Sequence, residues 1–131
     1  MAFKIKTTLT ESTPSVEYIK GTASESFRRG EALVYSQYGY LTQASGAVKP
    51  EYICAADVAL SASGGIVPVV SVRSDMLFEV PLSASGESLV CGNKVTIGSD
   101  GLTVTATLTN GTAEIVGIDG TASGDTVTVK F

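Results

Sequence analysis

The sequence predicts an all-β fold: a single small β-barrel or β-sandwich domain with short hairpins, preceded by an extended N-terminal arm. Apolar residues alternate with Thr or charged residues over several short segments, and dipeptides that favour tight turns separate these segments. No run of ten or more residues has the spacing of an amphipathic helix. A chain of 131 residues is long enough to bury a core without metals or disulfides.

The alternation is clearest near the C-terminus. Residues 102–108 place every apolar residue on one face and every Thr on the other, and residues 126–131 repeat the pattern. Asp100-Gly101 and Asn110-Gly111 supply the positive φ angles of tight hairpin turns. We therefore predict a hairpin between residues 93–97 and 102–108, and another around Asn110-Gly111.

Further strands are predicted upstream, at residues 16–20, 31–35, 40–43, 52–55, 66–72 and 76–82. Because proline has no N–H to donate to a ladder, Pro68 and Pro81 predict that their strands lie at an edge or carry a bulge. Residues 55–63 are the one candidate for a short helix, and their Ser-Gly-Gly exit is equally compatible with a loop.

The beginning of the chain differs from the rest. Phe3 and Ile5 alternate with Lys4 and Lys6, before a polar Thr-Glu-Ser-Thr-Pro stretch. We predict an N-terminal arm over residues 1–15 and a single β-domain over residues 16–131. An apolar face flanked by two ammonium groups suits contact with an acidic partner, so these four residues are predicted to bind another protein. The alternative is that they form the first strand of the domain's own sheet, because alternation does not distinguish the two.

Charge and hydropathy narrow the partners. The net charge is −4, and Arg28-Arg29 is the only adjacent basic pair, so nucleic-acid binding is not expected. The longest apolar stretch, residues 66–72, is too short to cross a bilayer, and the first residues do not resemble a signal peptide. We therefore expect no membrane partner, and synthesis in a cytoplasm.

The chain offers little for catalysis. It has no His, and its acidic residues are spread singly through predicted turns. We expect no enzyme activity, catalytic residue, cofactor, metal or small-molecule substrate. Cys54 and Cys91 are predicted to be buried free thiols, with a disulfide as the alternative. Residues 119–125 are predicted to connect a hairpin, with a calcium loop as the alternative.

Several short segments, each predicted to be a turn followed by a strand, are similar to segments of a known protein family. In chain order they are residues 30–35, 39–42, 50–57, 66–70, 92–96 and 124–131, the last reading Gly-Asp-Thr-Val-Thr-Val-Lys-Phe. Together they resemble the small head decoration (cement) proteins of tailed bacteriophages and prophages, over roughly residues 21–131.

The resemblance implies a compact β-domain, often trimeric, that binds the outside of the head shell and stabilises it. The implied partners are the major capsid protein and further copies of the chain, and the implied location is the capsid surface of the virion. Phe3, Lys4, Ile5 and Lys6 are then the predicted capsid or subunit contact. The alternatives are another phage structural component (head fibre, tail tube or head-completion protein) and a virion carbohydrate-binding or adhesion module, against which the absence of Trp counts.

Overall fold

The computed structural model describes residues 2–8 and 15–131 and confirms the all-β prediction. These residues contain no helix, and so none that is long and apolar enough to cross a membrane. The strands are β1 (Lys4–Thr8), β2 (Val16–Gly21), β3 (Ser26–Phe27), β4 (Ala32–Tyr35), β5 (Leu41–Gln43), β6 (Tyr52–Cys54), β7 (Val58–Ala59), β8 (Gly65–Ser71), β9 (Met76–Pro81), β10 (Lys94–Val95), β11 (Ala113–Ile118) and β12 (Thr126–Lys130).

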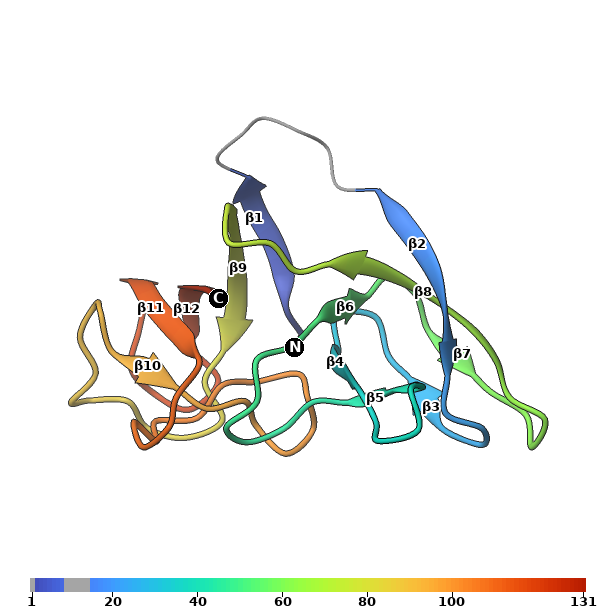
Figure 1. The fold of residues 1–131 in the computed structure, drawn as a ribbon. Coiled ribbons are helices and arrows are strands. Elements are labelled where there is room, and N and C mark those ends of the chain that lie inside the picture. The colour runs from blue at the N-terminus through green and yellow to red at the C-terminus, as the bar shows by residue number, and fades with distance from the viewer. Residues whose placement is uncertain (1, 9–14) are drawn as a thin grey trace.

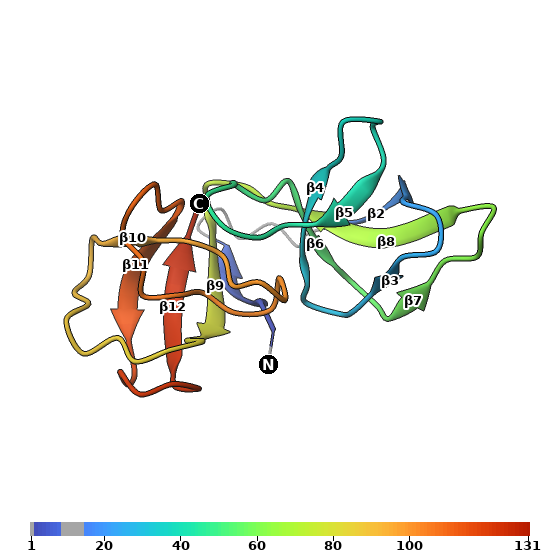
Figure 2. The same cartoon turned by 90° about the horizontal axis from the view of Figure 1, so that it is seen from below.

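The strands form two halves that lie side by side in both views (Figures 1 and 2). The barrel half, residues 16–71, is a closed barrel of order β2-β5-β4-β6-β8 with a small β3-β7 ribbon. The sheet half, residues 2–8 and 76–131, is a five-stranded sheet of order β1-β9-β12-β11-β10, antiparallel throughout. The barrel half is therefore one continuous segment, inserted between two neighbouring strands of the sheet half.

Two hydrophobic clusters divide the core. The larger one fills the sheet half and extends to Ala32, Ala44 and Ile53 of the barrel half, so the two halves share it. The smaller one lies inside the barrel, and its largest member is Phe27. Its other buried members are Leu33, Leu41, Cys54, Val67 and Val69.

Backbone hydrogen bonds join the halves along a seam. Gly46 and Ile97 exchange two of them, at 2.8 and 2.9 Å, and the amide of Ala32 donates to the carbonyl of Gly101 at 2.8 Å. The amide of Phe3 donates to the carbonyl of Gly30 at 3.0 Å. The seam is thus held by fixed main-chain contacts as well as by apolar packing.

The prediction that the strands of Pro68 and Pro81 lie at an edge or carry a bulge is wrong. β8 lies between β2 and β6, and β9 lies between β1 and β12. Neither ladder of β8 shifts register, and the one shift beside β9 places the extra residue on β1. Each proline instead sits where a neighbouring ladder has already ended. The carbonyl of Pro68 accepts from Ala55, beyond the last paired residue of β6, and that of Pro81 accepts from Val104, beyond the end of β1. The N–H and C=O of a strand residue point the same way, so no ladder donor is lost at either proline.

Residues 102–108 do not form the predicted half-buried strand. They do pair with residues 96–98 across the predicted turn: the amide of Gly98 donates to the carbonyl of Thr103 at 2.8 Å, and the amide of Thr105 to that of Thr96 at 3.0 Å. This pairing leaves only isolated bridges, from Val104 to Leu82 and Ile97, and Thr103 is buried while Leu108 is exposed. Main-chain segments lie on both sides of this stretch, so alternation did not decide which side chains face water. Residues 55–63 contain β7 and no helix.

The predicted turn chemistry holds at some positions and differs at others. Gly101 has a φ of 70° and Asn110 a φ of 56°, as the tight turns require. Gly111 serves a different purpose, because a Cβ there would lie 2.1 Å from the carbonyl oxygen of Lys94. Glycine is needed at this position because a side chain would clash with β10, and not because of its φ.

Candidate contact surfaces

The predicted contact residues lie on β1, the edge strand of the sheet half. β1 pairs antiparallel with β9, from Lys4 opposite Glu79 to Thr8 opposite Met76. Phe3 is only 3% exposed, and its ring lies 6.3 Å from that of Phe78 and 5.9 Å from that of Phe131. In this arrangement Phe3 is a core residue of the chain, which sequence alternation did not reveal.

The other three predicted residues are exposed on this strand. The ammonium of Lys6 lies 3.7 Å from the carboxylate of Glu79, while Lys4 and Ile5 face solvent. The ladder shifts register between Ile5 and Thr7, and both a bulge and lysines discourage pairing at an open edge. The capsid or subunit contact stays a prediction for Lys4, Ile5 and Lys6. Residues 1 and 9–14 of the predicted arm lie outside the described residues.

A groove of about 770 Å³ runs between β1 and the barrel half. Its walls are mostly apolar, with Ile5 on one side and Val16, Ile53 and Val70 on the other. Lys4 and Arg29 are the charged residues that line it. None of the described residues that line the groove is acidic, although the chain as a whole is acidic.

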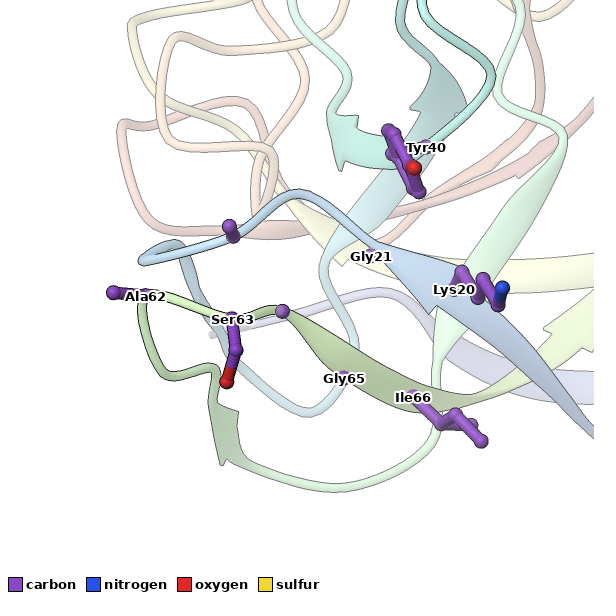
Figure 3. Close-up of a pocket in the computed structure, with 9 residues that line it drawn as sticks. Lys20, Gly21, Tyr40, Ala62, Ser63, Gly65 and Ile66 are labelled. Atoms are coloured by element: carbon purple, nitrogen blue, oxygen red, sulfur yellow. The ribbon is translucent and has the colours of Figure 1, made fainter.

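A second, smaller pocket of about 420 Å³ lies at the far end of β2 and β8 (Figure 3). Glycines and alanines form much of its wall, and Lys20, Tyr40 and Ser63 supply its polar groups. Figure 3 shows that the side chains of Lys20 and Ser63 point in different directions instead of meeting at one point. A convergent set of acid, base or nucleophile, as catalysis requires, is not formed here.

Exposed tyrosines mark the barrel half. All five tyrosines of the chain lie between residues 16 and 71, and Tyr18 and Tyr38 are the most exposed, at 70% and 77%. Tyr35 and Tyr52 meet edge-to-face, with their hydroxyl oxygens 3.0 Å apart. The hydrogen bond between the two hydroxyl groups is the main cause that raises the pKa of Tyr52 to about 12. Tyrosine is a frequent residue of protein interfaces because it combines a large apolar face with a polar tip.

One carboxyl group is buried at the seam. Glu31 is 2% exposed, and burial raises its pKa to about 7, against a smaller opposing effect of the nearby Arg28 guanidinium. The Nε of Arg28 lies 3.9 Å from Oε1 of Glu31, whereas Oε2 has no hydrogen-bond partner. Glu25 and Asp100 add to the rise through their negative charges. The sequence placed Glu31 at a strand start and gave no sign of its burial.

The remaining predicted chemistry can be placed directly. Both cysteines are free thiols, but only Cys54 is buried, so the prediction for Cys91 is wrong because its loop leaves it exposed. Residues 119–125 connect β11 and β12 as predicted, with Oδ2 of Asp125 accepting from the amide of Ala122 at 3.1 Å. Within residues 2–8 and 15–131, no three His, Cys, Asp or Glu side chains are grouped in a way that could hold a metal ion.

Sequence comparisons return no relative: no protein-family model matches the chain, and no curated protein matches it. Its fold is similar to a solved structure, the crystal structure of the head fibre gp8.5 N base in bacteriophage phi29. The TM-score is 0.61 at 20% sequence identity, and the match covers 89% of this chain and 94% of that chain. The likeness therefore concerns the arrangement of nearly the whole chain.

Proposed function

We propose that this chain is a structural protein of a phage virion that binds the outside of the head shell and stabilises it. The observation that carries the proposal is the shared fold with a phage head fibre base over nearly the full length of both chains. A fold alone does not fix a function, but this neighbour comes from the same kind of particle that the sequence phrases indicate.

The surfaces of the chain support a binding role and not a catalytic one. The polar groups of the smaller pocket do not converge, the chain has no His, and the buried carboxyl of Glu31 lies at the seam and lines neither pocket. By contrast, the barrel half exposes several aromatic and aliphatic side chains. We therefore expect no enzyme activity, and a protein surface as the main partner.

The proposed partners are the major capsid protein and further copies of this chain, with a homotrimer as the favoured assembly. Three copies around a three-fold axis of the shell would make three identical contacts, so modest single affinities would multiply. Lys4, Ile5 and Lys6 on the exposed strand β1 are the proposed shell contact.

A second candidate role is favoured by the same comparison. The structural neighbour is described as the N base of a head fibre, so this chain is also a candidate for the base by which a fibre is attached to a head. Both roles place the chain on the virion surface. They differ in whether the bound chain ends at the shell or carries a further structure outward.

The experiment is binding to empty head shells of the phage or prophage that carries the gene. We expect purified protein to sediment with the shells, to saturate at a fixed number of copies, and to raise the shell's melting temperature. Electron cryomicroscopy of the saturated shells then locates the density and separates decoration from a fibre base. Protein that stays in the supernatant at every concentration would contradict the proposal.

A further inference from the structure

Among the described residues, the outer face of β2 and β8 forms an apolar surface that is largely exposed, with Val70 half-buried against the shared core. On β2, Ile19 packs inside the barrel, so Val16, Tyr18 and Lys20, which alternate with it, point outward. Their partners across the ladder on β8 are Val70, Pro68 and Ile66, respectively. Tyr18 and Ile66 are 70% and 55% exposed, which is high for large apolar side chains in the middle of a sheet.

This face continues into both cavities of the barrel half. Val16 and Val70 also line the groove beside β1, while Lys20 and Ile66 also line the smaller pocket, where Figure 3 shows both projecting from neighbouring strands. The combined surface, which we call the β2–β8 face, contains the residues of the smaller pocket together with Val16, Tyr18, Pro68 and Val70. Among the described residues, its charged member is Lys20, which is positive.

The sheet half carries a surface of complementary character. The loop of residues 82–93 and the turn of residues 118–126 are held together by a 2.7 Å hydrogen bond from Gly86 to Thr121. They contribute the exposed acids Glu87, Asp119 and Asp125, and contain no Lys or Arg. Val90, in the same loop, is 60% exposed. This acidic end thus combines negative charge with an apolar side chain.

One copy of the chain does not bring these two surfaces together. In Figure 2, β2 and β8 belong to the barrel half, and the loop before β10 lies at the opposite end of the molecule. A contact between them therefore joins two copies head to tail. Such a contact uses two different patches. It closes into a ring when a whole number of equal rotations, with no shift along the axis, makes a full turn.

We propose that the β2–β8 face binds the acidic end of a second copy of this chain. The exposed apolar residues supply the burial, and the opposite charges select the partner and fix its orientation. This inference rests on the proposed function for its oligomer and names the surfaces that form it. It also separates the roles of the molecule: β1 is left free for the shell, and the outer barrel serves the contact between copies.

Cross-linking tests the contact with thiols, because the acidic end already carries one. Cys91 is exposed next to Val90, whereas Cys54 is buried. In the variant Tyr18→Cys, a short bis-maleimide should link the introduced thiol of one copy to Cys91 of the next, giving covalent dimers and trimers on denaturing gels. The matched control is Tyr38→Cys, which changes an equally exposed tyrosine that lines neither cavity and should give no such products.

A second substitution distinguishes the proposed head-to-tail contact from a contact between two β2–β8 faces. Adding Cys91→Ser to Tyr18→Cys should abolish the products, because each link needs both thiols. Products that persist would mean that the β2–β8 face meets itself, which overturns the proposal. Absence of products both in solution and on decorated shells overturns it as well. Shell binding is scored separately by sedimentation, so a failure of the proposed function is recognised as loss of binding and not as loss of cross-links.

Charge reversal provides an independent measurement by analytical ultracentrifugation. Lys20→Glu and Glu87→Lys should each lower the association constant by about tenfold at low salt, because each places like charges across the contact. The double variant restores opposite charges at every contact and should recover most of the association. Single variants that associate like the original chain, or a double variant as weak as the singles, would contradict the proposed pairing of surfaces.

Discussion

The two halves of the molecule use the same short strands but differ in what they bury and what they expose. The sheet half holds most of the large core, and its segment 76–131 has two lysines against six acidic residues. The barrel half has a smaller core, nearly balanced charge, and all five tyrosines. Among the described residues, six of the ten exposed large hydrophobic side chains lie on the barrel's strands or its β4–β5 turn, at Val16, Tyr18, Tyr35, Tyr38, Tyr40 and Ile66.

This difference indicates a division of labour. The sheet half supplies most of the stability, because burial of apolar area is the dominant favourable contribution to folding. The barrel half exposes part of its apolar surface to solvent. This surface does not stabilise a single copy, but it is available to a partner. Core substitutions and surface substitutions should therefore have separable effects in the two halves.

The largest expected effect comes from Phe78→Ala. Phe78 is fully buried in the core that both halves share and contacts the rings of Phe3 and Phe131. We expect a loss of about 3–5 kcal/mol in the free energy of unfolding, with both halves melting together. Phe27→Ala, in the barrel's own core, should instead raise hydrogen exchange in the barrel half first. Equal exchange in both halves of the Phe27 variant would mean that they do not differ in this way.

The seam should respond to pH through Glu31. Its pKa is about 7 in the folded chain and near its ordinary value of 4.5 when unfolded. As pH rises from 4.5 to 7, the unfolded chain releases this proton while the folded chain retains it, so stability falls, by at most about 3 kcal/mol, and levels off above pH 7.

Glu31→Gln removes this dependence because the amide does not ionise. The stability difference between the original chain and the variant, measured by urea unfolding, should shift in favour of the variant as pH rises. Glu51→Gln, an exposed carboxyl on the same half, is the control and should show no comparable trend. A difference that stays constant from about pH 4 to about pH 8 would contradict the burial of this carboxyl group.

A smaller effect is expected at the paired tyrosines. Tyr35→Phe removes the hydroxyl that is 3.0 Å from that of Tyr52, and should cost about 0.5–1 kcal/mol because the pair is partly exposed. The same change should lower the pKa of Tyr52 from about 12 toward its ordinary value of 10, which ultraviolet titration of the tyrosines detects. An unchanged titration curve would argue against the hydrogen bond.

The smallest effect on folding is expected at Tyr18. Because its side chain is 70% exposed, Tyr18→Ser should change the free energy of unfolding by less than about 0.5 kcal/mol. Self-association should nevertheless weaken, since the ring adds apolar area to the β2–β8 face, while the other apolar residues and the charges of the face keep part of the contact. Thermal melting at low concentration measures the first quantity and light scattering at high concentration the second. A large loss of stability would assign Tyr18 to the fold and not to the surface.

Much of the strand content could be predicted from period-two alternation, because a strand with one buried and one exposed face has alternating apolar and polar residues. The segment of residues 102–108 shows where the pattern fails. There Thr103 is buried and donates to Oδ1 of Asp100 at 3.1 Å, so a polar side chain is covered by satisfying it locally. The prediction for Pro68 and Pro81 is wrong for a related reason, because the length of a neighbouring ladder cannot be predicted from the sequence.

The contact surfaces were harder to predict than the fold. Phe3 alternates with lysines like an arm residue, and only the positions of Phe78 and Phe131 make it part of the core. The β2–β8 face did leave a signal, because on β8 the outward residues Ile66, Pro68 and Val70 are apolar and alternate with the apolar residues that face the barrel's core. A strand that is apolar on both faces is either buried within its own chain or bound to a partner, and only the three-dimensional structure distinguishes the two.

The insertion of the barrel half between β1 and β9 also sets the order in which the molecule is completed on the ribosome. Every strand of the barrel has been synthesised by Ser71, whereas β1 gains its neighbour only with β9 and the sheet is complete only after β12. During this interval the nascent chain presents β1 with both edges unpaired. Lys4 and Lys6 on that strand then act as a safeguard, because charged side chains deter an open strand from pairing with other chains before its own partner is made.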